Sequence, residues 1–338
     1  MIRAAILGLG RWGRTLVGSV QGKTDEIRFV AAHDTSAGKV ETFCRDNGLT
    51  FFENYDDILR DPNIDAVVIA TPHSRHFDQV CRAASAGKHV FTEKPLALDR
   101  HAAAEAVATV ARHGVRLAVG FVRRFHPSIC EVRARLADGR LGAIVGLVGQ
   151  QTSGTGPYLA ADGWRVDPKE SPAAAMTANG VHLLDHMIEF GGEIAGVQCV
   201  VGRHGVAHVD DTTSLLLTFR SGVTGLLFCT ISTGPNYNFS LYGSRGHAEV
   251  SDTTLDLFRF TPIPDRAPDG PVRQPESEVI RNHGVSMVQA EMLDFARCIT
   301  DGRPFFVPIA DVLHGIAVMD AITHSAKTGT FVDLRNFV

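Results

Sequence analysis

Residues 2–13 read IRAAILGLGRWG, an apolar run that passes directly into three closely spaced glycines. The apolar part predicts a buried strand, and the residues after the glycines follow a helical pattern. The segment thus places G-x-G-x-x-G between a strand and a helix. In that context the pattern indicates binding of a dinucleotide, whose pyrophosphate lies at the helix N-terminus.

Five residues of this turn have a predicted place in a cofactor site. Gly8 permits the tight turn, Gly10 lets a phosphate approach the backbone, and Gly13 lets helix and strand pack closely. Arg11 and Trp12 lie between these glycines, and we include both among the cofactor-binding residues. A glycine pattern alone also occurs by chance in many loops, so it needs support from other residues.

Asp34 supplies part of that support. It ends the second predicted strand and lies 21 residues after Gly13, close to the ~20-residue spacing at which a carboxylate binds the ribose hydroxyls of NAD. Its charge repels the 2′-phosphate of NADP, and Thr35 and Ser36 follow it in place of a lysine or arginine. We therefore predict NAD as the cofactor, with NADP as the alternative.

The surrounding pattern predicts an α/β fold with two domains. Over residues 1–122, short apolar runs alternate with helical segments, which indicates a Rossmann domain with a doubly wound parallel sheet covered on both faces. Over residues 123–338 we predict an α/β domain with a large, mainly antiparallel open sheet, because alternating segments are joined by glycine turns. Predicted hairpin turns lie at Ser221-Gly222 and at GSRG, residues 243–246, and an exposed loop is predicted for residues 261–278.

Composition narrows the class of protein. The 338 residues are 44% hydrophobic and 21% charged with a net charge of −4, and no basic block predicts a nucleic-acid partner. No apolar run is long enough to span a membrane, and the start lacks the pattern of a secretion signal. The six scattered cysteines form no C-x-x-C pair, so we expect reduced thiols, no metal site and a cytoplasmic location.

Two further strand ends carry candidate residues. Thr71, Pro72 and His73 follow the third strand, and strand ends near the switch point of such a sheet line the cofactor crevice. We predict cofactor contacts for these three, although a plain strand-ending turn is an equal alternative for His73. For His76 we favour the structural role.

The fourth strand ends in Glu93-Lys94-Pro95. We predict that Glu93 and Lys94 contact the cofactor. A lysine beside a cationic nicotinamide and partly removed from water is a plausible acceptor for the proton of a substrate hydroxyl. A solvated surface lysine is the alternative that spacing alone leaves open.

Several segments in order resemble one family: GLGRWGR, IATPHSRH, GKHVFTEKPLALD, GFVRRFHP, GWR, GVHLLD, DDTTSLLLTF and VDL. Together they are similar to glucose–fructose oxidoreductase, inositol dehydrogenase and the MocA-type proteins, the Gfo/Idh/MocA family, over essentially the whole chain. The resemblance implies an NAD(P)-dependent oxidoreductase that acts on sugars, inositols and related polyols. It also implies a homodimer or homotetramer assembled through the open sheet.

The resemblance implies roles for individual residues. Lys94 matches the family lysine that hydrogen-bonds the reacting hydroxyl. The resemblance also implies a cis peptide bond between Lys94 and Pro95, as in related enzymes. His182 matches a catalytic histidine, and Asp185, three residues later, faces the same side of its helix and orients His182 or contacts a sugar hydroxyl. We also assign Trp164 and Arg165 to substrate binding. A salt bridge between the two domains is the alternative for Arg165.

Ala178 departs from the family pattern. Many members carry an aspartate at this position, four residues before the histidine, and its loss leaves only Thr177 or Asn179 to support His182. This departure keeps two alternatives open beside a dehydrogenase: a non-redox, glycosidase-like enzyme that retains NAD, and a cofactor-sensing protein with weak or no turnover.

The assignment of Asp34 predicts a preference for NADH. Calorimetric titration of the purified protein with NADH and NADPH, after removal of any co-purified cofactor, should give clearly tighter binding of NADH because the carboxylate repels the 2′-phosphate. Tighter binding of NADPH would overturn the role of Asp34, and binding of neither would remove the basis of the functional hypothesis.

Overall fold

A computed structural model describes residues 1–173, 175–264 and 275–337. By their internal contacts they form two compact units, the first comprising Met1–Phe125 and Ser286–Ile316, the second His126–Val285 and Ala317–Val338. A late segment of the chain thus packs with the first unit. The predicted domain organisation, residues 1–122 and 123–338, places that segment in the second domain, and it stays a prediction.

The first unit is built on a parallel sheet of six strands in the order β3-β2-β1-β4-β5-β6. This is the strand order of a Rossmann fold, as predicted. Its strands are β1 Ile2–Leu7, β2 Ile27–His33, β3 Thr50–Phe51, β4 Ala66–Ile69, β5 His89–Glu93 and β6 Leu117–Gly120. Its helices are α1 Arg11–Val20, α2 Ala37–Asp46, α3 Tyr55–Arg60, α4 His76–Ser85, α5 Arg100–Arg112 and α8 Met287–Thr300, with the short η1 His73–Arg75 and η2 Val122–Phe125.

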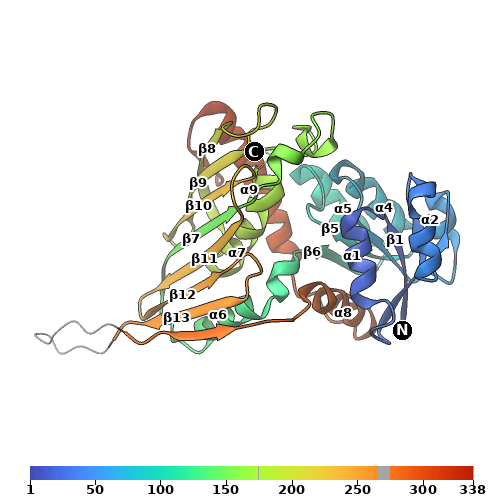
Figure 1. Ribbon diagram of the computed structural model, residues 1–338, viewed down its shortest axis with the longest axis horizontal. Coiled ribbons are helices and arrows are strands. Elements are labelled where there is room, and N and C mark those ends of the chain that lie inside the picture. The colour runs from blue at the N-terminus through green and yellow to red at the C-terminus, as the bar shows by residue number, and fades with distance from the viewer. Residues whose placement is uncertain (174, 265–274, 338) are drawn as a thin grey trace, which may run out of the picture. The chain divides into compact units, whose positions relative to one another are not determined.

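Helices cover both faces of this sheet because the chain winds in two directions from β1. The right-handed crossovers from β1 towards β3 place α1 and α2 on one face, and those from β4 towards β6 place α4 and α5 on the other. Accordingly, α4 packs against α5 and α1 packs against α8 (Figure 1). Residues 4–7 of β1 and 66–69 of β4 are fully buried, which explains why they are apolar without alternation.

Four elements of the first unit were not predicted: the short helices η1 and η2, strand β3 and helix α3. Strand β3 is only two residues long and lies at the edge of the sheet, and α3 has six residues. Both are too short for a periodic pattern to develop. Helix α3 nonetheless has an ordinary N-cap, because the Asn54 side chain accepts a hydrogen bond from the N–H of Asp56.

The second unit contains a nine-stranded sheet in the order β14-β13-β12-β11-β7-β10-β9-β8-β15. All neighbouring pairs are antiparallel except β7 and β10, so the mainly antiparallel sheet is confirmed. The strands are β7 Ile144–Thr152, β8 Ile194–Gly202, β9 Thr212–Phe219, β10 Thr224–Thr230, β11 Asn236–Gly243, β12 Gly246–Ser251, β13 Leu257–Pro262, β14 Glu278–Arg281 and β15 Val332–Asp333. The helical elements are α6 Pro127–Ala137, η3 Gly156–Tyr158, η4 Trp164–Val166, the π-helix η5 Met176–Gly180 and α7 Val181–Gly191; α9 Ile309–Thr328 is divided between the two units after Ile316.

The predicted turns of this sheet can be compared with the structure. Both hairpins are present, β9–β10 with Gly222 at φ +87° and β11–β12 around residues 243–246. In the predicted loop of residues 261–278, the first two residues instead complete β13 and the last begins β14. Residues 265–274 lie outside the described part of the chain.

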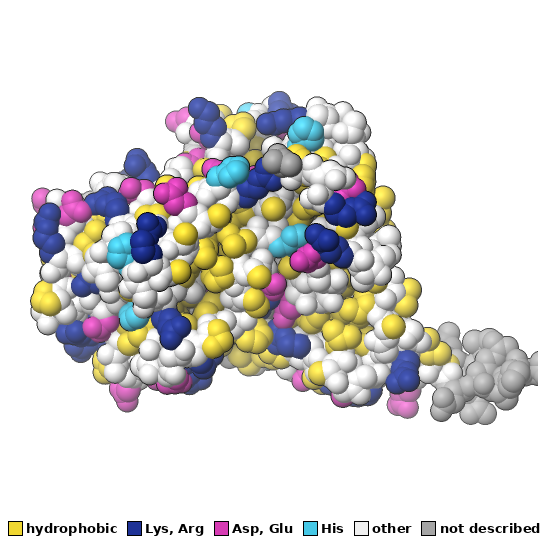
Figure 2. All heavy atoms as spheres, turned by 180° about the vertical axis from the view of Figure 1, so that it is seen from behind, with side chains coloured by type: hydrophobic (Ala, Val, Ile, Leu, Met, Phe, Trp, Pro, Cys, Tyr) yellow, Lys and Arg dark blue, Asp and Glu magenta, His cyan; other side chains and the backbone are white. Residues whose placement is uncertain are grey.

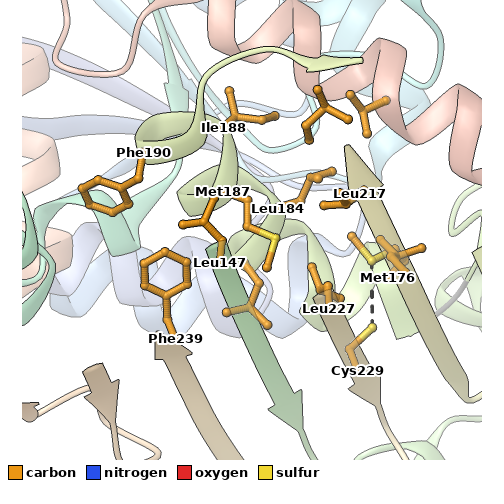
Figure 3. Packing of buried hydrophobic residues seen from close by; sticks show 14 of the residues in the cluster. Leu147, Met176, Leu184, Met187, Ile188, Phe190, Leu217, Leu227, Cys229 and Phe239 are labelled. Carbon is orange, nitrogen blue, oxygen red and sulfur yellow. Dashed lines mark hydrogen bonds between the residues drawn. The ribbon is translucent and has the colours of Figure 1, made fainter. Parts of the chain in front are cut away.

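One face of this sheet carries the core of the second unit. Leu184, Met187 and Ile188 of α7 pack on inward-facing side chains of the sheet (Figure 3). Burial alternates residue by residue along β9 and β10, as expected for strands with one covered face. The strand residues beneath the helix in Figure 3 are Leu147, Leu217, Leu227, Cys229 and Phe239.

The opposite face of the sheet is partly apolar and exposed. Leu216 of β9, Leu226 of β10 and Val148 of β7 lie side by side in one row across the sheet. Leu216 and Leu226 are exposed, as are the neighbouring Phe228 and Val200. We call these five residues the outer-face patch.

Charged side chains of both signs are interspersed over the face of the molecule drawn in Figure 2. Among the described residues, none of the helices is both long and apolar enough to cross a membrane.

A buried carboxylate organises the loop between β8 and β9. Asp211 is fully buried and accepts hydrogen bonds from the backbone N–H groups of His204, Gly205 and Val206, with the Gly205 bond at 2.5 Å and the Val206 bond at 2.7 Å. Burial disfavours its charge, but the hydrogen bonds from these N–H groups and from the Thr212 hydroxyl outweigh burial and lower the pKa of Asp211.

Replacing Asp211 with Asn should lower the free energy of unfolding by about 2 kcal/mol at pH 7, because the amide loses the charge that these donors stabilise. A lowered folded-state pKa stabilises the fold above pH ~4, and that contribution disappears as the pH falls. The difference between the wild type and Asp211→Asn in denaturant unfolding should therefore shrink on acidification.

Asp210→Asn is the matched control. Asp210 is paired with Arg203 at the surface, at 3.1 Å, and its replacement should change stability by less than about 0.5 kcal/mol. Equal effects of the two substitutions would contradict the role given to Asp211.

Candidate active site

The carboxyl ends of the parallel strands form one edge of the first unit. The strand register aligns His33, Leu7, Ile69 and Thr92 in a row across β2, β1, β4 and β5. The residues that follow each of them therefore begin loops side by side. The predicted cofactor-binding residues lie along this edge: Gly8, Gly10, Asp34, Thr71, Pro72 and Lys94 in the loops, Glu93 at the end of β5, His73 at the start of η1, and Arg11, Trp12 and Gly13 in the first turn of α1. Within this unit the structure therefore brings that set together.

The glycine-rich turn after β1 is tightly packed on one side and open on the other. Gly8 has φ +89°, and a Cβ there would lie 2.7 Å from the Ala70 carbonyl oxygen. A Cβ on Gly13 would lie 1.9 Å from the Gly8 carbonyl oxygen, whereas one on Gly10 would meet no atom within 4 Å. These surroundings match the turn, packing and approach roles predicted for the three glycines.

The open side of the turn faces the start of α1. Gly10 is the N-cap and provides no side chain, and the first turn, which includes Arg11 and Trp12, contains no acidic residue. The first N–H groups of a helix have no partners within it and carry the positive end of its dipole. This N-terminus therefore fits a pyrophosphate group.

Asp34 is held against the same turn. Its Oδ2 accepts a hydrogen bond from the Leu9 N–H at 2.7 Å, and its Oδ1 accepts one from the Ser36 N–H at 2.8 Å. Each carboxylate oxygen has a further lone pair, so the half-buried group can also accept from ribose hydroxyls. The residues present thus fit a dinucleotide with an unsubstituted ribose.

The loop after β4 leads into η1 and α4. The Thr71 hydroxyl donates to Gln79 Oε1 at 2.6 Å, and Pro72 precedes η1, which begins at His73. His76 is fully buried; its Nε2 lies 3.0 Å from the Thr71 carbonyl oxygen and its Nδ1 lies 2.7 Å from that of Pro95. The residue for which we favoured a plain structural role therefore joins two of the site loops.

Lys94 follows β5 directly, and the Lys94–Pro95 bond is cis, as the resemblance implied. The preceding Glu93 accepts a hydrogen bond from the indole N–H of Trp12. Burial raises the pKa of Glu93 to about 7, although the Trp12 hydrogen bond and the Lys94 charge act in the opposite direction. Glu93 also lies over Gly120, where a Cβ would be 2.9 Å from its Oε1.

Two arginines, Arg123 and Arg124, follow β6, and Arg124 has a structural role. Arg124 is buried and forms an ion pair with Asp311 at 2.8 Å. Both residues belong to the first unit. This pair ties the end of the sheet to the start of α9 within that unit.

The remaining candidates belong to the second unit. His182 and Asp185 lie three residues apart on α7, His182 half-buried and Asp185 buried. Trp164 and Arg165 lie in η4, where the Arg165 guanidinium stacks over the Trp164 ring at 4.3 Å. The predicted residues thus form two sets, one in each unit.

The segment before α7 is a π-helix that contains Ala178. Thr177 and Asn179, the two residues considered as supports for His182, make other hydrogen bonds. The Thr177 hydroxyl donates to the Pro172 carbonyl at 2.5 Å, and the Asn179 amide donates to Ser153 Oγ at 3.0 Å and to the Thr230 carbonyl at 3.1 Å. Both side chains thereby stabilise the π-helix itself. Such segments occur frequently at functional sites.

Comparison with known proteins finds two matching family models and several similar proteins. The model of an oxidoreductase family with an NAD-binding Rossmann fold, GFO_IDH_MocA, matches residues 2–121, and the GFO/IDH/MocA C-terminal domain matches residues 129–249. The scyllo-inositol 2-dehydrogenase (NAD(+)) of Bacillus subtilis is 28% identical and covers 98% of this chain and 96% of that protein. The uncharacterized oxidoreductase YrbE of the same species is 33% identical over 76% of each chain.

A solved structure has the same fold. Levoglucosan dehydrogenase in complex with NADH and L-sorbose superposes with a TM-score of 0.86 at 21% identity, over 98% of each chain. The two matching family models show that the chain belongs to the Gfo/Idh/MocA family, an oxidoreductase family with an NAD-binding Rossmann fold.

Proposed function

We propose that this protein transfers a hydride between NAD and a secondary alcohol carbon of an inositol, a sugar or a related polyol. The observation that carries the proposal is the single strand edge that presents the glycine-rich turn, Asp34 and Lys94 together. Relatives named as inositol dehydrogenases, at 28% and 37% identity, support the substrate class.

The cofactor would be held by residues of the first unit. The N–H groups at the start of α1 would bind the pyrophosphate, and Asp34 would bind the adenosine ribose. Thr71, Pro72 and His73 after β4 and Glu93 after β5 would flank the nicotinamide half. When bound, the nicotinamide supplies the site that donates or accepts the hydride.

Lys94 and His182 would handle the hydroxyl proton. The Lys94 ammonium would donate a hydrogen bond to the substrate oxygen, which favours loss of the hydroxyl proton as the C–H bond breaks. A neutral His182 imidazole would accept that proton. Asp185 would orient the imidazole or bind a neighbouring hydroxyl, and Trp164 and Arg165 would contact the polyol.

At position 178 this chain has alanine where many relatives have an aspartate. Its proposed substrate site therefore differs from theirs by one carboxylate. With alanine there, this chain supplies no acidic group four residues before His182.

We further propose a homo-oligomer in the cytoplasm. The outer-face patch places apolar side chains from four strands on an exposed sheet surface, which a second copy of the chain would cover. All six cysteines are free thiols, in keeping with a reducing compartment.

A glycosidase-like enzyme that retains NAD is the alternative that Ala178 left open, and the relatives named as inositol dehydrogenases do not favour it. It would release nitrophenol from p-nitrophenyl glycosides without net change of the cofactor. The proposed dehydrogenase would instead form NADH in proportion to polyol consumed.

Replacement of either Lys94 or His182 by alanine should lower kcat on an identified polyol at least about 100-fold, because each removes a group that acts on the hydroxyl proton. NADH affinity, measured by calorimetry, should stay within about threefold of the wild type. Lys327→Ala and His101→Ala remove exposed residues of the same types and serve as controls. Wild-type kcat in both site variants would refute the mechanism.

Leu226→Glu should convert the oligomer to a monomer in light scattering, because it places a charge at the centre of the outer-face patch. Val279→Glu adds the same charge at the exposed edge strand β14 and should leave the assembly unchanged. An unaltered mass for Leu226→Glu, or a monomeric wild type, would exclude this surface as the interface.

A further inference from the structure

The short segment that carries Lys94 is attached to its surroundings on both sides. On the N-terminal side, Glu93 accepts the indole N–H of Trp12, which lies in the first turn of α1. On the C-terminal side, the Pro95 carbonyl faces Nδ1 of the buried His76 at 2.7 Å. Lys94 therefore lies between two residues whose polar groups are held by other elements.

The Trp12 contact links the turn that fits the phosphates to the segment that carries the lysine. The two residues are 81 positions apart in sequence, and α1 and β5 are separate elements of the same unit. Gly120 on β6 lies beneath the Glu93 carboxyl group, where a Cβ would be only 2.9 Å from Oε1. The Glu93 side chain is thus fixed between an indole, a strand and its neighbour Lys94.

The His76 contact links the same segment to the loop after β4. Its two ring nitrogens face the Thr71 and Pro95 carbonyl oxygens at 3.0 and 2.7 Å. Carbonyl oxygens can only accept, so the imidazole donates to at least one of them and, when doubly protonated, to both. A fully buried ring that spans two loops restricts their separation.

We propose that Trp12 and His76 are positioning residues that brace residues 93–95 from two sides and thereby hold the Lys94 ammonium in place for proton transfer. The proposal rests on the role proposed above for Lys94. It assigns to Trp12 a function in the chemical step, beyond its place in the phosphate-binding turn. A small displacement of a reacting group lowers the rate strongly while leaving binding nearly unchanged.

The Trp12 contact can be tested without substrate or cofactor. The chain has two tryptophans, so Trp164→Phe leaves Trp12 as the only one. Because the pKa of Glu93 is raised to about 7, the emission of Trp12 should change with pH around a midpoint of about 7. Adding Glu93→Gln should remove that transition.

The groups around Glu93 make this readout specific. Its charged neighbour is Lys94 on the same segment, while α1 contributes the indole of Trp12 and β6 contributes Gly120. If Trp164→Phe does not fold, the difference between wild-type and Trp12→Phe emission gives the same curve. A flat curve between pH 5 and 9, or one that Glu93→Gln does not alter, would refute the Trp12 brace.

The kinetic test separates positioning from binding. Trp12→Phe keeps an aromatic ring and removes the N–H, so kcat should fall about 10- to 100-fold, while KM and NADH affinity stay within about threefold. His76→Phe should behave alike. His76→Gln should recover part of the loss, because its amide can donate to one of the two carbonyls.

Gln21→Met is the matched control for stability. Gln21 lies at the opposite end of α1 and bonds the Phe29 and Asn47 carbonyls at 3.1 and 2.8 Å. Its loss should lower stability without changing kcat. Wild-type kcat in Trp12→Phe, or an equal loss in Gln21→Met, would overturn the proposal while the proposed function stands. Failure of the proposed function would instead appear as a wild-type chain without polyol turnover whose Trp12 emission still titrates.

Discussion

The contact between Gly13 and the Gly8 carbonyl oxygen is the constraint on which the first unit depends. A Cβ on Gly13 would lie 1.9 Å from that oxygen, so α1 can approach the end of β1 only because Gly13 lacks a side chain. This approach sets the direction of α1 and leaves its first N–H groups at the strand edge. It also brings Trp12 close to Glu93. The absence of a side chain at Gly13 thus positions both the phosphate-binding turn and Trp12, which contacts the segment of Lys94.

Much of the fold could be predicted because the relevant patterns are local. The run from Ile2 to Leu7 coincides with β1, and continuous apolar segments correctly indicated strands buried on both faces. Strand β3 and helix α3 were missed because two and six residues carry no readable period. Two features depend on contacts between segments far apart in the sequence: Ser286–Ile316 packs with the first unit, and β7 pairs in parallel with β10. Residue patterns along the chain do not specify such contacts.

The residues of the candidate site could likewise be predicted only in part. The glycines, Asp34 and Lys94 could be named from spacing and from the family pattern, since each follows a predicted strand. The link from Trp12 to Glu93 could not, because it joins residues 81 positions apart. The position of His76 was one available signal, since it begins an amphipathic helix directly after a strand-end loop. The sequence does not show, however, which carbonyl groups its imidazole contacts. The hydrogen bonds of Thr177 and Asn179 likewise reflect the local π-helix, which no propensity indicates.

That π-helix has a consequence for how this chain can change over time. A π-helix holds one residue more than the α-helix it interrupts, so Met176–Gly180 sets the rotational phase of everything that follows on α7. Removal of a single residue would turn His182 by about 100° around the helix axis, away from its present direction, although every side chain of α7 remained. Substitution inside the segment changes its packing, whereas a change of length reorients the helix. The length of this segment therefore fixes the orientation of α7, and an insertion or deletion within it would change that orientation.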